Sequence, residues 1–221
     1  MIDLHTHSFL SDGALIPSEL LRRAEHLGIE ALAITDHVDA SNLDFVVPRL
    51  VEVCRACAPH MEIRPIPGAE ITHAPPETIP KLAERARELG AAIVLVHGET
   101  PAEPVRPGTN RAALDAAIDI LAHPGLITPD EVALAAERGI ALEITSRKGH
   151  NVANGHVARL ALETGAELVL NTDAHEPGDL IGDDFAQTVL LGAGIPEDRL
   201  DSIFRKMQAL ANEASAALRS S

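Results

Sequence analysis

The 221-residue sequence has few aromatic residues and little cysteine. It contains no Trp or Tyr, and aromatic residues make up 2% of the chain. Stacking on bases or sugar rings is therefore not expected, and the core must consist of Ala, Leu, Ile and Val. Two cysteines cannot form a disulfide framework. The apolar runs are too short for a membrane span, and the N-terminus shows no secretion signal. These absences favour a cytoplasmic protein.

Basic residues are also scarce. The chain has 18 Lys and Arg against 33 Asp and Glu, which gives a formal net charge of -15. Nucleic acids and anionic membranes bind clustered cationic side chains. We therefore expect neither as the main partner, and a small molecule is favoured instead. The sequence leaves the oligomeric state unknown.

The chain alternates short apolar segments with amphipathic ones. The apolar segments predict strands at residues 1–2, 29–34, 62–71, 91–96, 118–122, 140–145 and 167–170. The amphipathic segments predict helices at residues 17–27, 43–58, 77–89, 109–117, 128–138 and 152–164. Strands that are apolar on both faces are typical of a parallel sheet covered by helices. We expect one domain over residues 1–221, in which residues from about 180 to 221 form a C-terminal loop and a helix that acts as a packing element or a lid.

Ligand-type residues follow the predicted strands at regular intervals. His5, His37, Glu70, His97, His123, Glu143 and Asp173 are separated by 20 to 33 residues. A strand and its crossover helix occupy about 30 residues. An open doubly wound sheet is compatible with this pattern, but it would spread the strand ends by roughly 4.8 Å per strand. A closed barrel brings all these ends to one face, so the sequence favours a (β/α)7 TIM-like barrel with a site at the C-terminal ends of the strands.

The side chains at these ends are of the kinds that bind metals. His5 and His7 point to the same side of an extended chain because side chains alternate. The candidate metal ligands are His5, His7, Asp12, His37, Glu70, His97, His123, Asp173 and His175. Imidazoles and carboxylates without thiolates suit Zn, Mn or Fe. The set is too large for one ion, so two to three divalent metal ions are expected.

The order of these motifs resembles that of a known family. The motifs are Asp3-Leu4-His5-Thr6-His7, Ser11-Asp12-Gly13, Thr35-Asp36-His37, Gly68-Ala69-Glu70, His97, His123-Pro124 and Asp173-Ala174-His175. Together they look like the ordered motifs of the PHP (polymerase and histidinol phosphatase) family. The resemblance implies a distorted seven-unit barrel with a trinuclear metal centre and phosphoesterase activity.

The resemblance also implies how the ligands are divided. His5, His7, Glu70 and Asp173 would hold the first ion. Glu70 would bridge to a second ion held by His97 and His123. Asp12, His37 and His175 would hold the third ion. Some relatives have a histidine at the position of Asp12, so the third site here would be weaker or would prefer a harder metal.

Further residues are expected to support the site. Arg147 and Lys148 follow the sixth predicted strand, and Arg111 lies at the start of a helix, where anions are favoured. These three are the candidates for phosphate binding. Glu143, Asp3 and Asp36 are expected to orient ligand histidines rather than to bind metal. The catalytic candidates are Asp173, His175 and Arg147.

The expected function is a metal-dependent phosphatase acting on a small phosphorylated metabolite, such as a histidinol-phosphate-like monoester. A metal-activated hydroxide would attack phosphorus, Arg147 would share the developing charge, and His175 or a water would protonate the leaving group. One alternative is a phosphodiesterase or exonuclease acting on nucleotides or DNA ends. A metal-dependent amidohydrolase is disfavoured because His97 stands where that class has a lysine. A non-catalytic metal-binding regulatory domain is a further alternative.

Overall fold

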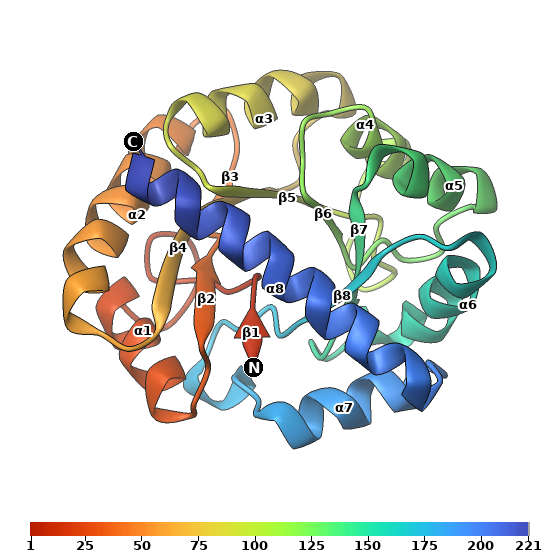
Figure 1. The fold of residues 1–221 in the computed structure, drawn as a ribbon. Coiled ribbons are helices and arrows are strands. Elements are labelled where there is room, and N and C mark those ends of the chain that lie inside the picture. The colour runs from red at the N-terminus through yellow and green to blue at the C-terminus, as the bar shows by residue number, and fades with distance from the viewer. Residues whose placement is uncertain (221) are drawn as a thin grey trace.

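The computed structural model describes residues 1–220, and residue 221 of the expected C-terminal segment lies outside this range. Its parallel strands are ordered β1-β2-β4-β5-β6-β7-β8, with β3 paired to β4. The strands are β1 (Ile2–Asp3), β2 (Ala31–Ile34), β3 (His37–Val38), β4 (Arg64–Ile71), β5 (Ile93–His97), β6 (Ile120–Ala122), β7 (Ala141–Thr145) and β8 (Leu168–Asn171). Helices surround the strands as a ring (Figure 1). The predicted α/β barrel is confirmed.

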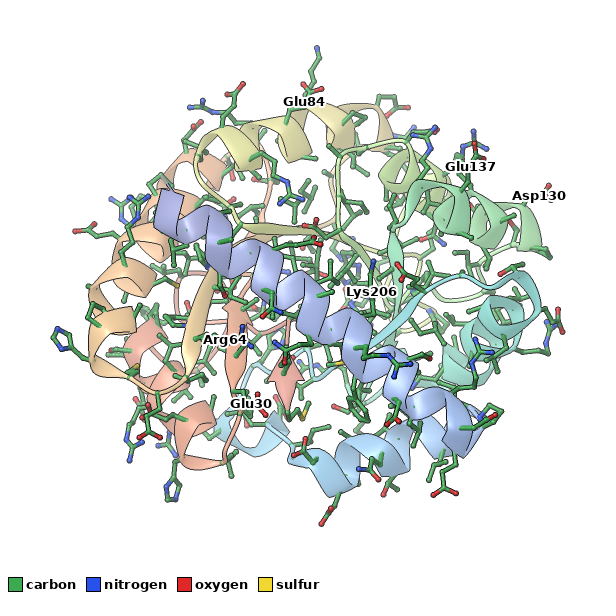
Figure 2. All side chains as sticks on the ribbon, in the orientation of Figure 1. Glu30, Arg64, Glu84, Asp130, Glu137 and Lys206 are labelled. Carbon is green, nitrogen blue, oxygen red and sulfur yellow. The ribbon has the colours of Figure 1, made fainter. Side chains whose placement is uncertain are left out.

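The helices follow the strands in the expected alternation. They are α1 (Pro17–His26), α2 (Leu43–Cys57), α3 (Ile79–Glu88), α4 (Thr109–Leu114), α5 (Pro129–Arg138), α6 (Asn154–Thr164), α7 (Asp183–Gly192) and α8 (Glu197–Ser220). The start of α5 is fixed by a capping box between Thr128 and Glu131, and Gly139 ends the helix with φ 68°. Glu84, Asp130 and Glu137 point outward from α3 and α5 (Figure 2). The polar helix faces therefore cover the outside of the barrel.

The barrel is distorted at the seam between β1 and β8. Here the backbones meet through a bridge between Thr6 and Ala174. The His7 N–H donates to the Ala174 carbonyl at 2.8 Å, and the Asp173 N–H donates to the His5 carbonyl at 2.9 Å. The Leu4 N–H bonds the Asn171 side-chain oxygen at 2.8 Å instead of a backbone carbonyl. The seam is therefore held by few ladder bonds, together with side-chain bonds of Asn171 and Asp3.

The strand β4 contains two prolines. Proline lacks a backbone N–H and so predicts interrupted pairing in this stretch, yet Pro65 and Pro67 both lie within β4 and are in register with Leu32 and Ile34 of β2. The Arg64 N–H donates toward β2, to the Glu30 carbonyl at 2.9 Å. Because N–H groups alternate along a strand, the proline nitrogens face away from β2, and pairing with β5 begins only at Gly68.

The short strand β3 was not predicted. After β2 the chain continues beside β4, where His37 is in register with Glu70 and Val38 with Ile71. The tripeptide Thr35-Asp36-His37 was expected to be the end of a strand. Its pairing with β4 places the His37 side chain next to Glu70.

Helix α8 is the packing element and not a lid. It contacts β1, β4 and β8 and crosses the barrel in Figure 1. Arg64 at the start of β4 donates to Asn212 of α8 at 2.8 Å, and Lys206 pairs with Glu167 just before β8 (Figure 2). These contacts place α8 at the N-terminal ends of the strands, opposite the candidate site. Among residues 1–220, no helix is both long and apolar enough to cross a membrane.

Candidate metal centre

The C-terminal strand ends bring the candidate ligands together. His5 and His7 follow β1, Glu70 lies near the end of β4, His97 ends β5, and Asp173 follows β8. The strands before them are apolar and buried on both faces. Side chains that leave these strand ends therefore point into the mouth of the barrel, where they meet polar side chains from other strand ends.

Two candidate ligands have an unusual backbone conformation. His123 has φ 26° and Asp173 has φ 53°, both in the left-handed region. Non-glycine residues with positive φ are uncommon and occur often at functional sites. At both positions the chain turns sharply out of a strand, and this turn directs the side chain toward the centre of the mouth.

Glu70 lies at the centre of the cluster and is fully buried. Its Oε1 is 3.4 Å from His5 Nε2 and 3.7 Å from His123 Nε2. Its Oε2 is 3.8 Å from His7 Nε2 and 2.6 Å from His37 Nδ1. One carboxylate thus reaches histidines of every expected subsite, as a bridging ligand must.

The first expected subsite is compact. Asp173 Oδ1 is 3.7 Å from His5 Nε2 and 3.1 Å from His7 Nε2. Ligand atoms at about 2.0–2.1 Å from a tetrahedral Zn²⁺ are roughly 3.3 Å apart. The distances that join His5 and His7 to Glu70 and Asp173 fall around this value, so the spacing of these side chains suits a bound cation.

The second expected subsite lies between β5 and β6. The rings of His97 and His123 are 4.5 Å apart and edge to face. His123 Nε2 is 3.7 Å from both Glu70 Oε1 and Asp173 Oδ2. His97 Nδ1 contacts the Gly98 carbonyl at 3.2 Å, which leaves Nε2 for another partner.

The third expected subsite is more exposed. Asp12 Oδ1 is 3.5 Å from His37 Nε2 and 3.2 Å from His175 Nε2. Asp12 lies on the predicted turn before Gly13, where an added Cβ would lie 2.3 Å from the His7 carbonyl oxygen. Only glycine fits this turn, which folds Asp12 back toward His175.

Several buried polar atoms in the cluster have no hydrogen-bond partner within residues 1–220: His5 Nε2, His7 Nδ1, His7 Nε2, Glu70 Oε1, His123 Nδ1 and Asp173 Oδ1. Buried polar atoms without partners are rare and costly. Imidazole nitrogens and carboxylate oxygens at these spacings are metal ligands. The donor set therefore fits bound divalent cations.

The pKa values describe the site before a cation binds. Burial raises the pKa of Asp173 to about 7. Burial lowers the pKa of His37, but the carboxylates of Glu70, Asp12 and Asp173 together outweigh burial and raise the pKa to about 8. Burial and neighbouring histidines lower the pKa values of His7 and His123 well below the ordinary value. His7 and His123 are thus neutral and ready to bind metal, whereas Asp173 and His37 must lose protons.

Three other acids support the cluster. Glu143 Oε1 accepts from His5 Nδ1 at 2.8 Å, and its Oε2 accepts from the His123 N–H at 3.0 Å. Asp3 binds the Thr172 hydroxyl at 2.5 Å and the His5 N–H at 3.3 Å, so it orients backbone and not an imidazole. Asp36 likewise binds the N–H and hydroxyl of Ser8, at 2.8 and 2.6 Å.

The three candidate phosphate-binding residues differ in position. Arg147 is half-buried, and its Nη1 donates to Asp179 at 3.0 Å. Asp179 also accepts the His175 N–H at 3.0 Å, which ties Arg147 to a candidate ligand. Lys148 is exposed in the same loop. Arg111 bonds Asp115 at 3.0 Å, and Asp115 in turn pairs with Arg138 of α5. The guanidinium of Arg111 is therefore engaged within the helical ring.

The sequence interpretation missed three residues near the second subsite. Glu103 lies 3.2 Å from His97 Nε2 and 2.9 Å from His73 Nε2. The ring of His150 is 4.4 Å from that of His123. His73 is exposed, whereas His150 is buried in the segment after β7. Each of these residues follows the C-terminal end of a strand. This position is the sequence feature that could have identified them as site residues.

Comparisons with known proteins agree with this geometry. The family model for the PHP domain matches residues 3–121. An uncharacterized protein of Methanocaldococcus jannaschii is 48% identical over 202 residues, which cover 90% of this chain and 93% of that protein. A probable phosphatase of Shewanella sp. (strain ANA-3) is 29% identical, and the alignment covers 90% of this chain and 86% of that protein.

Solved structures share the fold. Histidinol phosphate phosphatase from Lactococcus lactis, complexed with Zn, L-histidinol and phosphate, has a TM-score of 0.61 at 17% identity, with 88% of this chain and 94% of that chain covered. A chain of an archaeal ribonuclease P with mature tRNA has a TM-score of 0.74 at 18% identity, with 99% and 93% covered. The family match spans more than half of the sequence, and the chain therefore belongs to the PHP domain family.

Proposed function

We propose that this chain is a metal-dependent phosphatase that hydrolyses the monoester of a small phosphorylated metabolite. Family membership and the relatives described as probable phosphatases support a metal-dependent hydrolase of phosphoric esters. The observation that supports it most is the set of buried, partnerless imidazole and carboxylate atoms around Glu70. We assign them to two to three divalent cations of Zn, Mn or Fe, divided among the three subsites described above.

Bound cations would supply a water of lowered pKa and a clamp for phosphoryl oxygens. The chain's own contribution is to place the ligands before substrate arrives. Glu143 holds His5 by Nδ1, which leaves Nε2 for the first cation. Glu70 holds the subsites at a fixed spacing because its carboxylate is buried among four histidines.

Arg147 has donors left for substrate. A guanidinium has five N–H donors, and the Nη1 of Arg147 bonds Asp179. The remaining donors can bind a phosphoryl oxygen while Asp179 keeps the side chain next to His175. Lys148, exposed on the same loop, adds positive charge at the mouth. We assign both residues to the phosphoryl group.

We assign His175 two roles, metal ligand and general acid, which it cannot perform at the same moment. Its Nδ1 contacts the Asp173 carbonyl at 2.9 Å, so Nε2 is the atom that faces Asp12 and the mouth. A single nitrogen cannot both bind a cation and protonate a leaving group. His175 is thus a ligand when the third subsite is filled and a general acid when it is empty.

The test is release of inorganic phosphate from a panel of metabolite monoesters, with Mn²⁺ or Zn²⁺ added. The matched variants are His5→Ala and, as control, His26→Ala, because His26 is exposed on α1. We expect turnover by the wild type and the control and a loss of at least about a hundredfold in His5→Ala. Equal turnover by His5→Ala would falsify the assignment.

A phosphodiesterase is the second candidate. A relative described as a DNA polymerase/3'-5' exonuclease from Bacillus subtilis is 26% identical over 78% of this chain, although only 34% of that protein is covered. The formal net charge of -15 opposes long nucleic acids as substrates. Bis-nitrophenyl phosphate hydrolysed much faster than the monoester would favour this candidate. Tight binding of zinc without hydrolysis of any ester would indicate a non-catalytic metal-binding domain.

A further inference from the structure

The loop between β5 and α4, residues 98–108, has a fixed base at the mouth of the barrel. Glu99 Oε1 accepts the N–H groups of Gly108 and Asn110 at 2.9 and 3.0 Å, which ties the two ends of the loop together. An added Cβ at Gly98 would lie 2.3 Å from the Ala122 carbonyl oxygen. The loop therefore leaves β5 in one direction, against the end of β6.

The middle of this loop presents Glu103 to three histidines. Its Oε2 is 2.9 Å from His73 Nε2 and 3.2 Å from His97 Nε2, and its Oε1 is 3.5 Å from His150 Nε2. Thr100 of the same loop contacts His150 Nδ1 at 2.9 Å. The Nε2 atom of His150 is therefore the one that faces the cluster.

His150 also approaches the second subsite. It is buried, and single ligand atoms of His97, His123 and His150 all lie within 4.8 Å of one another. The same holds for His73, His97 and Glu103. The two groups share His97, so they adjoin each other at its ring.

We propose that Glu103 and His150 are additional ligands of the cation held by His97 and His123. This inference rests on the proposed metal centre. The distances from Glu103 to the nitrogens of His97 and His150 are close to the roughly 3.3 Å between ligands of a tetrahedral cation. A cation that replaces the protons shared by these groups would leave the side chains where they are. The loop at residues 98–108 is then fastened over the mouth when this cation is bound.

A second arrangement makes the opposite prediction. If Glu103 only neutralises protonated histidines, a cation at His97 must displace it, and Glu103 competes with metal. Removing the carboxylate would then strengthen metal binding. The effect of Glu103→Gln on affinity therefore distinguishes a ligand from a competitor.

The experiment is a calorimetric Zn²⁺ titration of the wild type, Glu103→Gln, His150→Gln and the control Glu77→Gln. Glu77 is an exposed acid before α3 that contacts Arg106 of the same loop. We expect one Zn²⁺ to bind at least about tenfold more weakly in Glu103→Gln and His150→Gln and unchanged in the control. Hydrogen exchange in residues 100–106 should slow when Zn²⁺ binds to the wild type, but not to Glu103→Gln.

Unchanged or tighter Zn²⁺ binding by Glu103→Gln would overturn the inference. Circular dichroism of each variant, matched to the wild type, shows that lost affinity is not lost folding. A wild type that binds no Zn²⁺ or Mn²⁺ would overturn the metal centre itself. A wild type that binds three ions with no effect of Glu103→Gln would overturn only this inference.

Discussion

Glu143 links two candidate ligand histidines to the end of β8. Its Oε1 accepts from His5 Nδ1 and from the Asn171 side chain, both at 2.8 Å, and its Oε2 accepts from the His123 N–H. We predict that Glu143→Gln weakens metal binding by about tenfold to a hundredfold, because His5 loses its anionic partner. Zn²⁺ titration measures this, with Glu163→Gln on the outer face of α6 as control. Equal affinity in Glu143→Gln and the control would contradict it.

The titration of single ligands also predicts the pH dependence of metal binding. Without a cation, Asp173 has a pKa of about 7 and His37 a pKa of about 8. Below these values protons occupy the ligand atoms, so a cation must displace them, and raising the pH removes this competition. We expect affinity for Mn²⁺ to rise with pH and to level off above about pH 8, with protons released at about pH 6. Calorimetry in buffers of different ionisation enthalpy counts the released protons, and a pH-independent affinity would refute this account.

At the scale of elements, the turn after β1 positions Asp12. A Cβ at Gly13 would lie 2.3 Å from the His7 carbonyl oxygen and 2.9 Å from the Ser8 carbonyl carbon, both backbone atoms. We predict that Gly13→Ala displaces the turn and weakens the third subsite, whereas Gly192→Ala, where the added Cβ meets no atom within 4 Å, has no such effect. The number of bound Mn²⁺ ions per chain measures this. A full complement of ions in Gly13→Ala would show that the turn can adjust.

The elements themselves were largely predictable from the sequence, and their exceptions have physical causes. Apolar runs that end in His37, Glu70, His97 or Asp173 specify buried parallel strands and the face on which they end. The prolines of β4 predict poor pairing, but strand propensity does not show toward which neighbouring strand a backbone nitrogen points. In β4 both proline nitrogens point away from the paired strand β2. Glu103 was missed because a loop residue has no periodicity, and its partners His73, His97 and His150 come from other loops and strands.

At the scale of the whole molecule, α8 closes the end of the barrel opposite the site. Met207 of this helix is buried in the core. We predict that Met207→Ala lowers the free energy of unfolding by about 2–5 kcal/mol, because the change removes buried apolar atoms from the core. Metal affinity should not change, since the helix and the site lie at opposite strand ends. Urea unfolding measures the loss of stability, with Gln208→Ala at a half-buried position of the same helix as control. A parallel loss of Zn²⁺ affinity in Met207→Ala would contradict the expectation that metal binding does not change.

The placement of α8 could not be read from the sequence, which left packing element and lid as alternatives. An amphipathic helix shows which of its faces is apolar but not which end of a barrel that face covers. The contacts of Arg64 with Asn212 and of Lys206 with Glu167 show that α8 covers the N-terminal ends of the strands. The fold and the ligand pattern also do not specify the substrate. Ligand residues recognise cations and phosphoryl oxygens and not the organic group of the substrate.

The seam between β1 and β8 gives the cations a mechanical role. His5 and His7 lie on one side of the seam, and Asp173 and His175 lie on the other. Ions bound between them therefore link the beginning of the chain to its last strand. Because few backbone bonds span this line, chelation should let the barrel open here first. We expect amide exchange at His7 and Asp173 to accelerate on chelation while amides of β5 and β7 stay protected, which nuclear magnetic resonance can follow residue by residue.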